Sequence, residues 1–129
     1  MTTFFAPQLF IPNGTVDISF YERAFNAIIQ RRWDNDDGSL HVAEISIGEA
    51  LFQIHEARKD SWQLIPKAIN GTTVLVGLFV DDVDKIMEQA IGAGATLVSP
   101  ATTYDYAYRQ GEIKDPFGHI WLIEKKVNG

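Results

Sequence analysis

The feature that most constrains this 129-residue sequence is that one order of predicted elements occurs twice. Each half begins with a mostly apolar stretch typical of a strand, continues with an amphipathic helix, and ends with three further strand-like stretches. The predicted strands are residues 4–11, 27–33, 40–47 and 50–56 in the first half, and 72–80, 95–98, 102–114 and 119–125 in the second. Such a repeat indicates duplicated modules within one domain.

The two predicted helices carry apolar residues at helical spacing. In the first helix, which begins near Thr15, these are Val16, Phe20, Ala24 and Ile28; in the second, which Asp81 and Asp82 cap, they are Val83, Ile86, Ala90 and Ala93. An apolar stripe of this kind packs against a sheet. Twisted antiparallel sheets that bury one face under a helix can curl the other face into a concave cleft, where small ligands usually bind.

A stretch without either periodicity separates the two halves. It covers about residues 58–71 and contains Trp62 and Pro66. We expect it to connect module one, about residues 1–57, to module two, about residues 72–129, within a single domain. A connector of this length in a compact domain is often functional or mobile.

Composition excludes several classes of function. The chain has 17 acidic and 11 basic residues and a net charge of −6, which argues against nucleic acid or an anionic membrane as its partner. It has no cysteine, so disulfides, zinc–thiolate sites and cysteine nucleophiles are excluded. No apolar run approaches the roughly 20 residues of a membrane span, and the first residues lack the basic start of a signal peptide. We therefore expect a cytoplasmic protein.

The segment 115–121, Asp-Pro-Phe-Gly-His-Ile-Trp, predicts a turn and a hairpin. Asp115 can bond its own backbone, Pro116 presets φ, and Gly118 suits the last position of a type I turn. We expect this segment to act as a structural clasp that sets the register of the final hairpin. In that role His119 makes a structural hydrogen bond behind the turn, and Trp121 packs on the convex side.

Several short segments occur in an order and spacing that resemble one protein family. They are residues 19–21 with 24–25, 41–45, 79–84, 93–96, 108–111 and 115–121. Together they make the chain similar to the vicinal oxygen chelate superfamily, which includes glyoxalase I, extradiol dioxygenases, and fosfomycin and bleomycin resistance proteins. The PhnB-like proteins are the most similar branch.

The resemblance implies an α+β fold in which two βαβββ modules form a curved antiparallel or mixed sheet with a concave cleft. This is the glyoxalase/bleomycin resistance/dihydroxybiphenyl dioxygenase fold. The resemblance also implies a homodimer.

Metal-dependent members of this superfamily bind a divalent ion through His, Glu or Gln side chains on the first and last strands of the modules. Carried over by the motifs, these positions are Ala6, Gln53, Leu75 and Leu122. Only Gln53 can coordinate a metal, and a shift of one residue does not supply the other ligands, whereas such ions need three or four. We therefore expect no metal and no other cofactor.

Histidines and glutamates offer a less favoured chemistry. His41 and His55 fall on adjacent predicted strands, but His41 and Glu44 are three residues apart on a strand and so point to opposite faces. An unconventional metal site is the alternative for these histidines. General acid–base catalysis by Glu44 or Glu56 is the alternative to a solvated strand face.

Aromatic residues provide the remaining candidates for a cleft. Tyr104, Tyr106 and Tyr108 alternate along the predicted strand and, with Trp62 and Trp121, would line a site for a flat or hydrophobic ligand. The same face would otherwise pack on the connector or on a second subunit. Arg109 projects to the other face, where it either anchors an anionic ligand or lies on the surface.

These observations favour a metal-free protein that binds a small-molecule ligand, like the bleomycin resistance proteins. The candidate ligand-binding residues are Gln53, His55, His41, Tyr106, Tyr108, Arg109 and Trp62. The alternatives are a metal-dependent enzyme of glyoxalase or lyase type with a displaced or degenerate metal site, and a dimer scaffold without a ligand.

Overall fold

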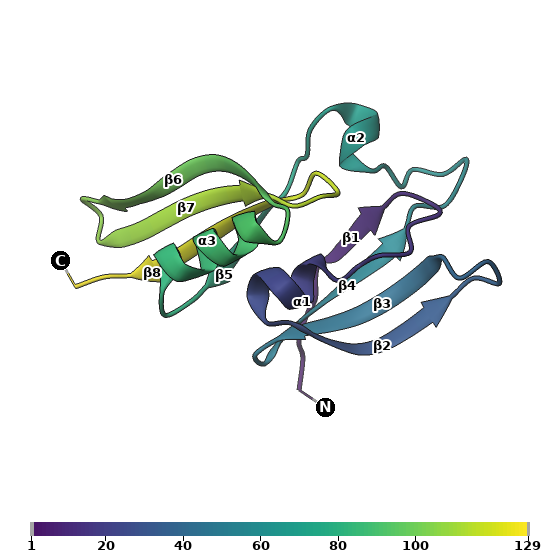
Figure 1. Ribbon diagram of the computed structural model, residues 1–129, viewed down its shortest axis with the longest axis horizontal. Coiled ribbons are helices and arrows are strands. Elements are labelled where there is room, and N and C mark those ends of the chain that lie inside the picture. The colour runs from purple at the N-terminus through teal and green to yellow at the C-terminus, as the bar shows by residue number, and fades with distance from the viewer. Residues whose placement is uncertain (1, 129) are drawn as a thin grey trace.

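Two four-stranded sheets, one from each half of the chain, form the frame of the molecule (Figure 1). The computed structural model describes residues 2–128. The first half contains β1 (Gln8–Ile11), α1 (Phe20–Phe25), β2 (Ile28–Asp34), β3 (Leu40–Ile47) and β4 (Ala50–Glu56). The strand order is β1-β4-β3-β2, and β1 runs parallel to β4 while the other pairs are antiparallel.

The second half repeats this topology. It contains α2 (Pro66–Ile69), β5 (Leu75–Phe79), α3 (Val83–Gly92), β6 (Thr96–Tyr104), β7 (Tyr108–Lys114) and β8 (Ile120–Lys126). The strand order is β5-β8-β7-β6, with β5 parallel to β8. The predicted α+β fold of two βαβββ modules is therefore confirmed, and α2 is an element of the connector that the sequence pattern did not reveal. Within residues 2–128, no helix is long and apolar enough to cross a membrane.

The first helix is shorter than its apolar stripe predicts. Although the stripe begins near Thr15, the side chain of Asp17 accepts a hydrogen bond from the backbone N–H of Ser19 at 2.9 Å, which forms a local turn before the helix. Asn26 then ends the helix in the left-handed region, with φ of 57°. An asparagine tolerates this conformation better than most residues. Ile28, which falls both in the predicted helical stripe and in the predicted strand 27–33, is an exposed residue of β2.

The predicted strand at 102–114 is in fact two strands joined by a tight turn. Ala107 has φ of 65°, and its N–H donates to the carbonyl of Tyr104 at 3.1 Å. Tyr104 and Tyr108 are therefore cross-strand partners, and Tyr106 lies in the turn between them. The prediction that these tyrosines alternate along one strand is wrong, because an alanine occupies the left-handed position that glycine or asparagine usually marks.

β6 continues through Pro100, where the sequence predicted its end. β6 lies at the edge of its sheet, so the missing N–H of a proline need not leave a ladder hydrogen bond unmade. The register between β6 and β7 shifts around this proline. The strand is thus irregular rather than interrupted.

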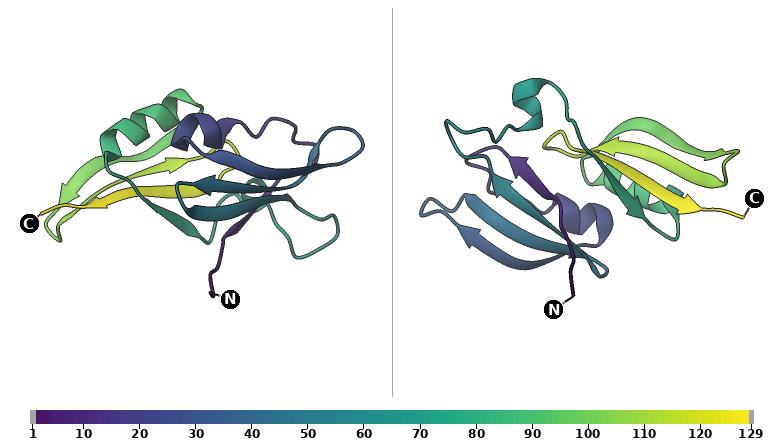
Figure 2. Two further views of the ribbon diagram at one scale, coloured as in Figure 1. Left: turned by 90° about the horizontal axis from the view of Figure 1, so that it is seen from below. Right: turned by 180° about the vertical axis from the view of Figure 1, so that it is seen from behind.

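The two modules pack against each other through their helices, and Figure 2 shows α1 and α3 on the same side of the two sheets. Gln89 of α3 donates hydrogen bonds of 2.9 and 3.0 Å to the C-terminal end of α1. One hydrophobic core runs through both modules. Trp121 lies where they meet, with its ring centroid 4.8 Å from that of Phe25 and 5.4 Å from that of Phe52. With 2% exposure it packs in the shared core and does not line a cleft.

Asp115 holds the predicted clasp together. Its Oδ1 accepts hydrogen bonds from the backbone N–H groups of Phe117 at 2.9 Å and His119 at 3.1 Å. Its Oδ2 accepts from the hydroxyl of Tyr21 at 2.6 Å and from the indole N–H of Trp121 at 3.0 Å. The carboxylate is buried but fully hydrogen-bonded, so it joins the last hairpin to α1 of module one.

The rest of the clasp also contacts the first module and the connector. His119 is buried, and its Nε2 donates to the carbonyl of Phe10 on β1 at 2.8 Å, in agreement with the predicted structural role. Gly118 has φ of 93°, and a Cβ there would lie 2.7 Å from the side chain of Pro66 on α2. Glycine is required here for both its conformation and its size.

Candidate functional site

The faces of the two sheets turned away from the helices carry several of the predicted site residues. On β1 and β4 the alternate apolar residues are buried in the core, whereas Gln8, Phe10, Gln53 and His55 lie on the opposite face. Gln8 and Gln53 are cross-strand partners, and the Gln8 amide N–H donates to the Gln53 oxygen at 2.6 Å. The sequence analysis identified Gln53 but missed Gln8, because the parallel pairing of β1 with β4 is not a local signal.

A cleft of about 370 Å³ opens beside this face. It lies between β1, the connector and the segment before β5, and its volume is within the range of sites for small molecules. Its walls include Gln8, Phe10, Trp62, Leu64, Ile69 and Val74. The ring of Trp62 stands edge-on to Phe10, with centroids 5.6 Å apart, and Phe10 stands edge-on to His55 at 6.4 Å. The structure thus brings three predicted residues, Gln53, His55 and Trp62, to one region.

A second cleft, of about 590 Å³, lies against the clasp. Its lining includes Lys67, Asn70, Lys114, Pro116 and Phe117. None of the predicted site residues lines it.

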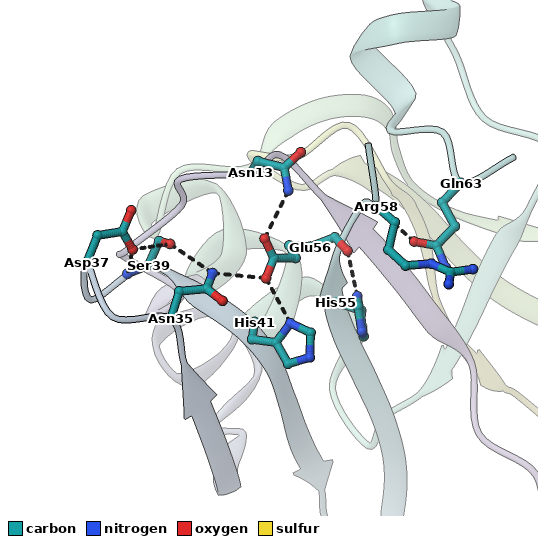
Figure 3. A network of polar contacts seen from close by, with 9 residues as sticks. All are labelled: Asn13, Asn35, Asp37, Ser39, His41, His55, Glu56, Arg58 and Gln63. Carbon is teal, nitrogen blue, oxygen red and sulfur yellow. Dashed lines mark hydrogen bonds and ion pairs between the residues drawn. The ribbon is translucent and has the colours of Figure 1, made fainter. Parts of the chain in front are cut away.

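Glu56, at the end of β4, is the centre of the polar network in Figure 3. It accepts hydrogen bonds from Asn13 at 2.9 Å, from Asn35 at 2.9 Å and from Nδ1 of His41 at 2.8 Å. Burial alone raises the pKa of Glu56, but the hydrogen bonds from Asn35, His41 and Asn13 outweigh it, so the pKa lies below its ordinary value of 4.5. An ionised, satisfied carboxylate of this kind is suited to structure and is a poor general base at neutral pH.

The two histidines of module one are close together but are already engaged. The ring centroids of His41 and His55 are 4.8 Å apart, and Nδ1 of His55 lies 2.5 Å from the carbonyl of Glu56. On β3, Glu44 is the cross-strand partner of Gln53. The prediction that Glu44 and His41 point to opposite faces assumed regular alternation, but the register of β3 shifts beside His41, where Leu40 and Ala43 are both buried. Throughout residues 2–128, no three His, Asp or Glu side chains come together in a way that would hold a metal ion.

The four positions that bind metal in relatives of the resembled family do not fit a divalent ion here. Leu75 and Leu122 are apolar, Ala6 precedes β1, and the side-chain oxygen of Gln53 accepts the hydrogen bond from Gln8. In the pairing of β5 with β8, the partner of Leu122 is Gly77, which has no side chain to bind a metal. Three or four oxygen or nitrogen ligands are needed, and this set offers one.

The second sheet carries a polar group that the sequence analysis missed. Glu124 is two residues beyond Leu122 on β8 and therefore lies on the same face, yet only 7% of it is exposed. Gln110 on β7 donates to Oε1 of Glu124 at 2.9 Å and accepts from the hydroxyl of Tyr106 at 2.5 Å. A shift of two residues along a strand keeps a side chain on its face, so the alternation along β8 points to Glu124 where a shift of one residue does not.

Arg109 lies apart from the other candidates. Its guanidinium makes a bidentate ion pair with Asp84 of α3, through contacts of 2.8 and 2.7 Å. This hydrogen-bonded partner raises the pKa of Arg109. The structure therefore places Arg109 on the helix side of the second sheet, while Tyr108 lies on the opposite face beside Tyr106.

Comparison with known proteins identifies the family. The family model of the Glyoxalase/Bleomycin resistance protein/Dioxygenase superfamily matches residues 9–123. An uncharacterized protein of Mycobacterium bovis is 30% identical over 125 residues, which are 95% of this chain and 82% of that protein.

Solved structures show the same fold. A gene product of Arabidopsis thaliana matches with a TM-score of 0.75 at 21% identity, over 95% of this chain and 98% of that chain. A glyoxalase-related enzyme from Fulvimarina pelagi matches with a TM-score of 0.72 at 17% identity, over 98% and 89% of the two chains. The chain therefore belongs to the glyoxalase/bleomycin resistance protein/dioxygenase superfamily.

Proposed function

We propose that this protein binds a small, largely apolar molecule in the 370 Å³ cleft beside β1. In this proposal it acts without a metal ion and belongs to the PhnB-like branch of its superfamily. The ligand is held by apolar contact and by a few hydrogen bonds, without a covalent step.

The observation that carries the proposal is the aromatic wall of this cleft. Trp62 is 74% exposed although it stands against Phe10, so a large apolar surface faces water until a ligand covers it. At the rim, the bond between Gln8 and Gln53 uses one group of each amide. The oxygen of Gln8 and the nitrogen of Gln53 remain to give a ligand orientation.

The donor set at the four superfamily positions supports binding without a metal. Gln53 alone offers a ligand atom there, and Gln8 already bonds it. The competing proposal, a metal-dependent glyoxalase or lyase with a displaced site, needs a set of ligands elsewhere in the chain. The two proposals differ in their dependence on metal, which makes them separable by experiment.

We also propose that the protein is a cytoplasmic homodimer. Each sheet has an unpaired edge strand next to the connector, β1 or β5. Phe4, Phe5 and Leu75, on or next to these strands, are each more than half exposed. A second copy of the chain would cover this apolar surface. Light scattering on the purified protein is expected to report twice the chain mass.

The ligand proposal is tested by screening small aromatic metabolites for compounds that raise the unfolding temperature. We expect Trp62→Ala to weaken the binding of such a compound about tenfold, a loss of about 1.4 kcal/mol of contact. Trp33→Ala is the matched control, because Trp33 lies on β2 under the guanidinium of Arg31, outside the cleft. Trp33→Ala should bind the compound with the same affinity as the unaltered protein.

Two results would contradict the proposal. The first is that no compound stabilises the protein at high concentration. The second is one bound ion per chain in protein purified without an affinity tag, together with activity that requires Ni²⁺, Zn²⁺, Mn²⁺ or Fe²⁺ and is abolished by a chelator. That second result would establish the metal-dependent alternative.

A further inference from the structure

The face of the second sheet turned away from α3 contains a negative charge with no positive partner. Glu124 lies on β8, between β5 and β7, and only 7% of it is exposed. The ion pairs formed within residues 2–128 do not include it. A carboxylate in such a position is costly unless hydrogen bonds or a cation compensate for the lost water.

The neighbouring strands hold this carboxylate in a defined orientation. Gln110 donates to Oε1 of Glu124, and the hydroxyl of Tyr106 bonds the oxygen of Gln110 in turn. The other oxygen, Oε2, lies over Gly77 of β5, where a Cβ would approach it to 2.8 Å. In the described part of the chain, every fully buried side-chain oxygen or nitrogen has a hydrogen-bond partner. Within residues 2–128 no hydrogen bond to Oε2 is formed, so this oxygen is not fully buried.

Aromatic rings surround the same spot. Phe79 is the cross-strand partner of Glu124, and its ring centroid is 6.3 Å from that of Tyr108, edge-on. Tyr106 lies 5.9 Å from Tyr108 and is stacked on Tyr104 at 5.2 Å. Phe79 and Tyr106 are both more than half exposed. Aromatic faces carry partial negative charge and attract cations, most strongly where water is partly excluded.

The charge pattern around the site has the sign that favours a cation. Glu112 lies on the same face of β7, two residues from Gln110, and the whole chain has a net charge of −6. Partial burial, followed by the charges of Tyr104, Asp105 and Glu124, raises the pKa of Tyr106. Lys114 and Lys126 stand at the ends of this face, outside ion-pair distance of Glu124.

We propose that this face binds an organic ammonium group, with Oε2 of Glu124 as its counter-ion and the rings of Phe79, Tyr106 and Tyr108 as its walls. A metal ion is a poor alternative, because it needs several oxygen ligands and the site offers one free carboxylate oxygen among aromatic faces. An alkylated ammonium group is large and weakly hydrated, and it uses the rings and the carboxylate together. The site is separate from the cleft at Trp62, and its contacts are independent of the function proposed there.

Choline and 3,3-dimethylbutan-1-ol form a suitable pair of probes, because they have the same shape and differ in charge. We expect choline to shift the backbone amide signals of Gly77 and Gln110 saturably in a nuclear magnetic resonance titration of the full chain. The neutral alcohol should bind at least about fivefold more weakly, the difference that cation–π and counter-ion contacts of about 1 kcal/mol produce.

Two substitutions test the assigned contacts. Glu124→Gln removes the charge but keeps the shape and an oxygen that accepts from Gln110, and should weaken choline binding about tenfold. Gly77→Ala places a methyl group 2.8 Å from the position of Oε2 and should weaken choline binding several-fold by displacing the carboxylate. Gly92→Ala is the matched control, since a Cβ there meets no atom within 4 Å, and its affinity should be unchanged.

The outcomes separate this inference from the function proposed above. Equal binding of the two probes, or equal affinity of Glu124→Gln and the unaltered protein with both folded by their amide spectra, would overturn it. Choline shifts confined to Phe10 and Trp62 would also overturn it and would leave the Trp62 cleft as the binding site. Absence of any saturable shift on the second sheet would overturn it as well, without bearing on the binding of apolar compounds.

Discussion

Tyr21 and Asp115 form a hydrogen bond that joins α1 to the turn of the last hairpin, 94 positions apart in the sequence. The phenol is fully buried, and its hydroxyl lies 2.6 Å from Oδ2 of the carboxylate. Burial, the negative charge of Asp115 and the hydrogen bond all raise the pKa of Tyr21 well above its ordinary value of 10.0. The folded protein therefore keeps a proton that the unfolded chain loses in alkaline solution.

This difference gives Tyr21 a defined effect of pH on stability. Above about pH 10 the unfolded state binds fewer protons than the folded state, so the stabilisation is full below that pH and falls as pH rises, by up to about 1.4 kcal/mol per pH unit. Tyr21→Phe removes the ionisable group. We expect it to be less stable than the unaltered protein at neutral pH, by about 1–2 kcal/mol, because Asp115 loses a donor.

The stability difference between the two proteins should then shrink as pH rises beyond about 10. Urea unfolding at several pH values measures it. A difference that stays constant across this range would show that Tyr21 does not titrate with folding.

At the scale of elements, the hairpin of β6 and β7 depends on one unusual residue. Ala107 adopts a left-handed conformation, with φ of 65°, at the tip of the hairpin. Its N–H bonds the carbonyl of Tyr104, and its carbonyl accepts from Val127 at 3.0 Å. An L-residue with a Cβ is strained by about 1–2 kcal/mol in this conformation, and the neighbouring contacts hold it there.

Replacing this alanine by glycine should relieve the strain. We expect Ala107→Gly to stabilise the protein by about 0.5–1 kcal/mol, since the relief exceeds the larger chain entropy that glycine gives the unfolded state. Ala101→Gly, within β6, should instead destabilise by at least about 0.5 kcal/mol, because that position needs no left-handed conformation. The urea midpoints of the two variants should move in opposite directions. A loss of stability in Ala107→Gly would show that Ala107 is not strained.

At the scale of the whole molecule, the two modules share a core and should unfold together. Trp121 comes from the last strand of module two, yet it packs on Phe25 and Phe52 of module one. We expect calorimetry to show one transition with equal calorimetric and van't Hoff enthalpies. Trp121→Ala should cost about 3–5 kcal/mol through lost burial and the cavity left behind.

Amide hydrogen exchange can show whether that loss is shared. Protection of β3 in module one and of β7 in module two should fall together in Trp121→Ala, since both rest on the same core. Trp62→Ala, at an exposed position, should change the free energy of exchange of β3 and of β7 by no more than about 0.5 kcal/mol each. Loss of protection in β7 alone would mean that the modules unfold independently.

Much of this architecture is contained in the local pattern of the sequence. The period of apolar residues predicted the element order, the duplication and the hairpin after Asp115, because helices and strands each repeat over a few residues. Turn chemistry identified the clasp, and alternation along β8 placed Trp121 and Leu122 on opposite faces of the sheet. The family resemblance rested on these same local segments.

The remaining features depend on contacts between segments that are distant in sequence. The pairing of Gln8 with Gln53 follows from a parallel strand pair, and the network of Glu56 draws on residues from four separate segments. Glu124 acquires its position from Gly77 on one neighbouring strand and Gln110 on the other. Periodicity specifies which face a side chain takes, but only packing decides which side chains meet, because register and the approach of two modules are properties of the folded chain.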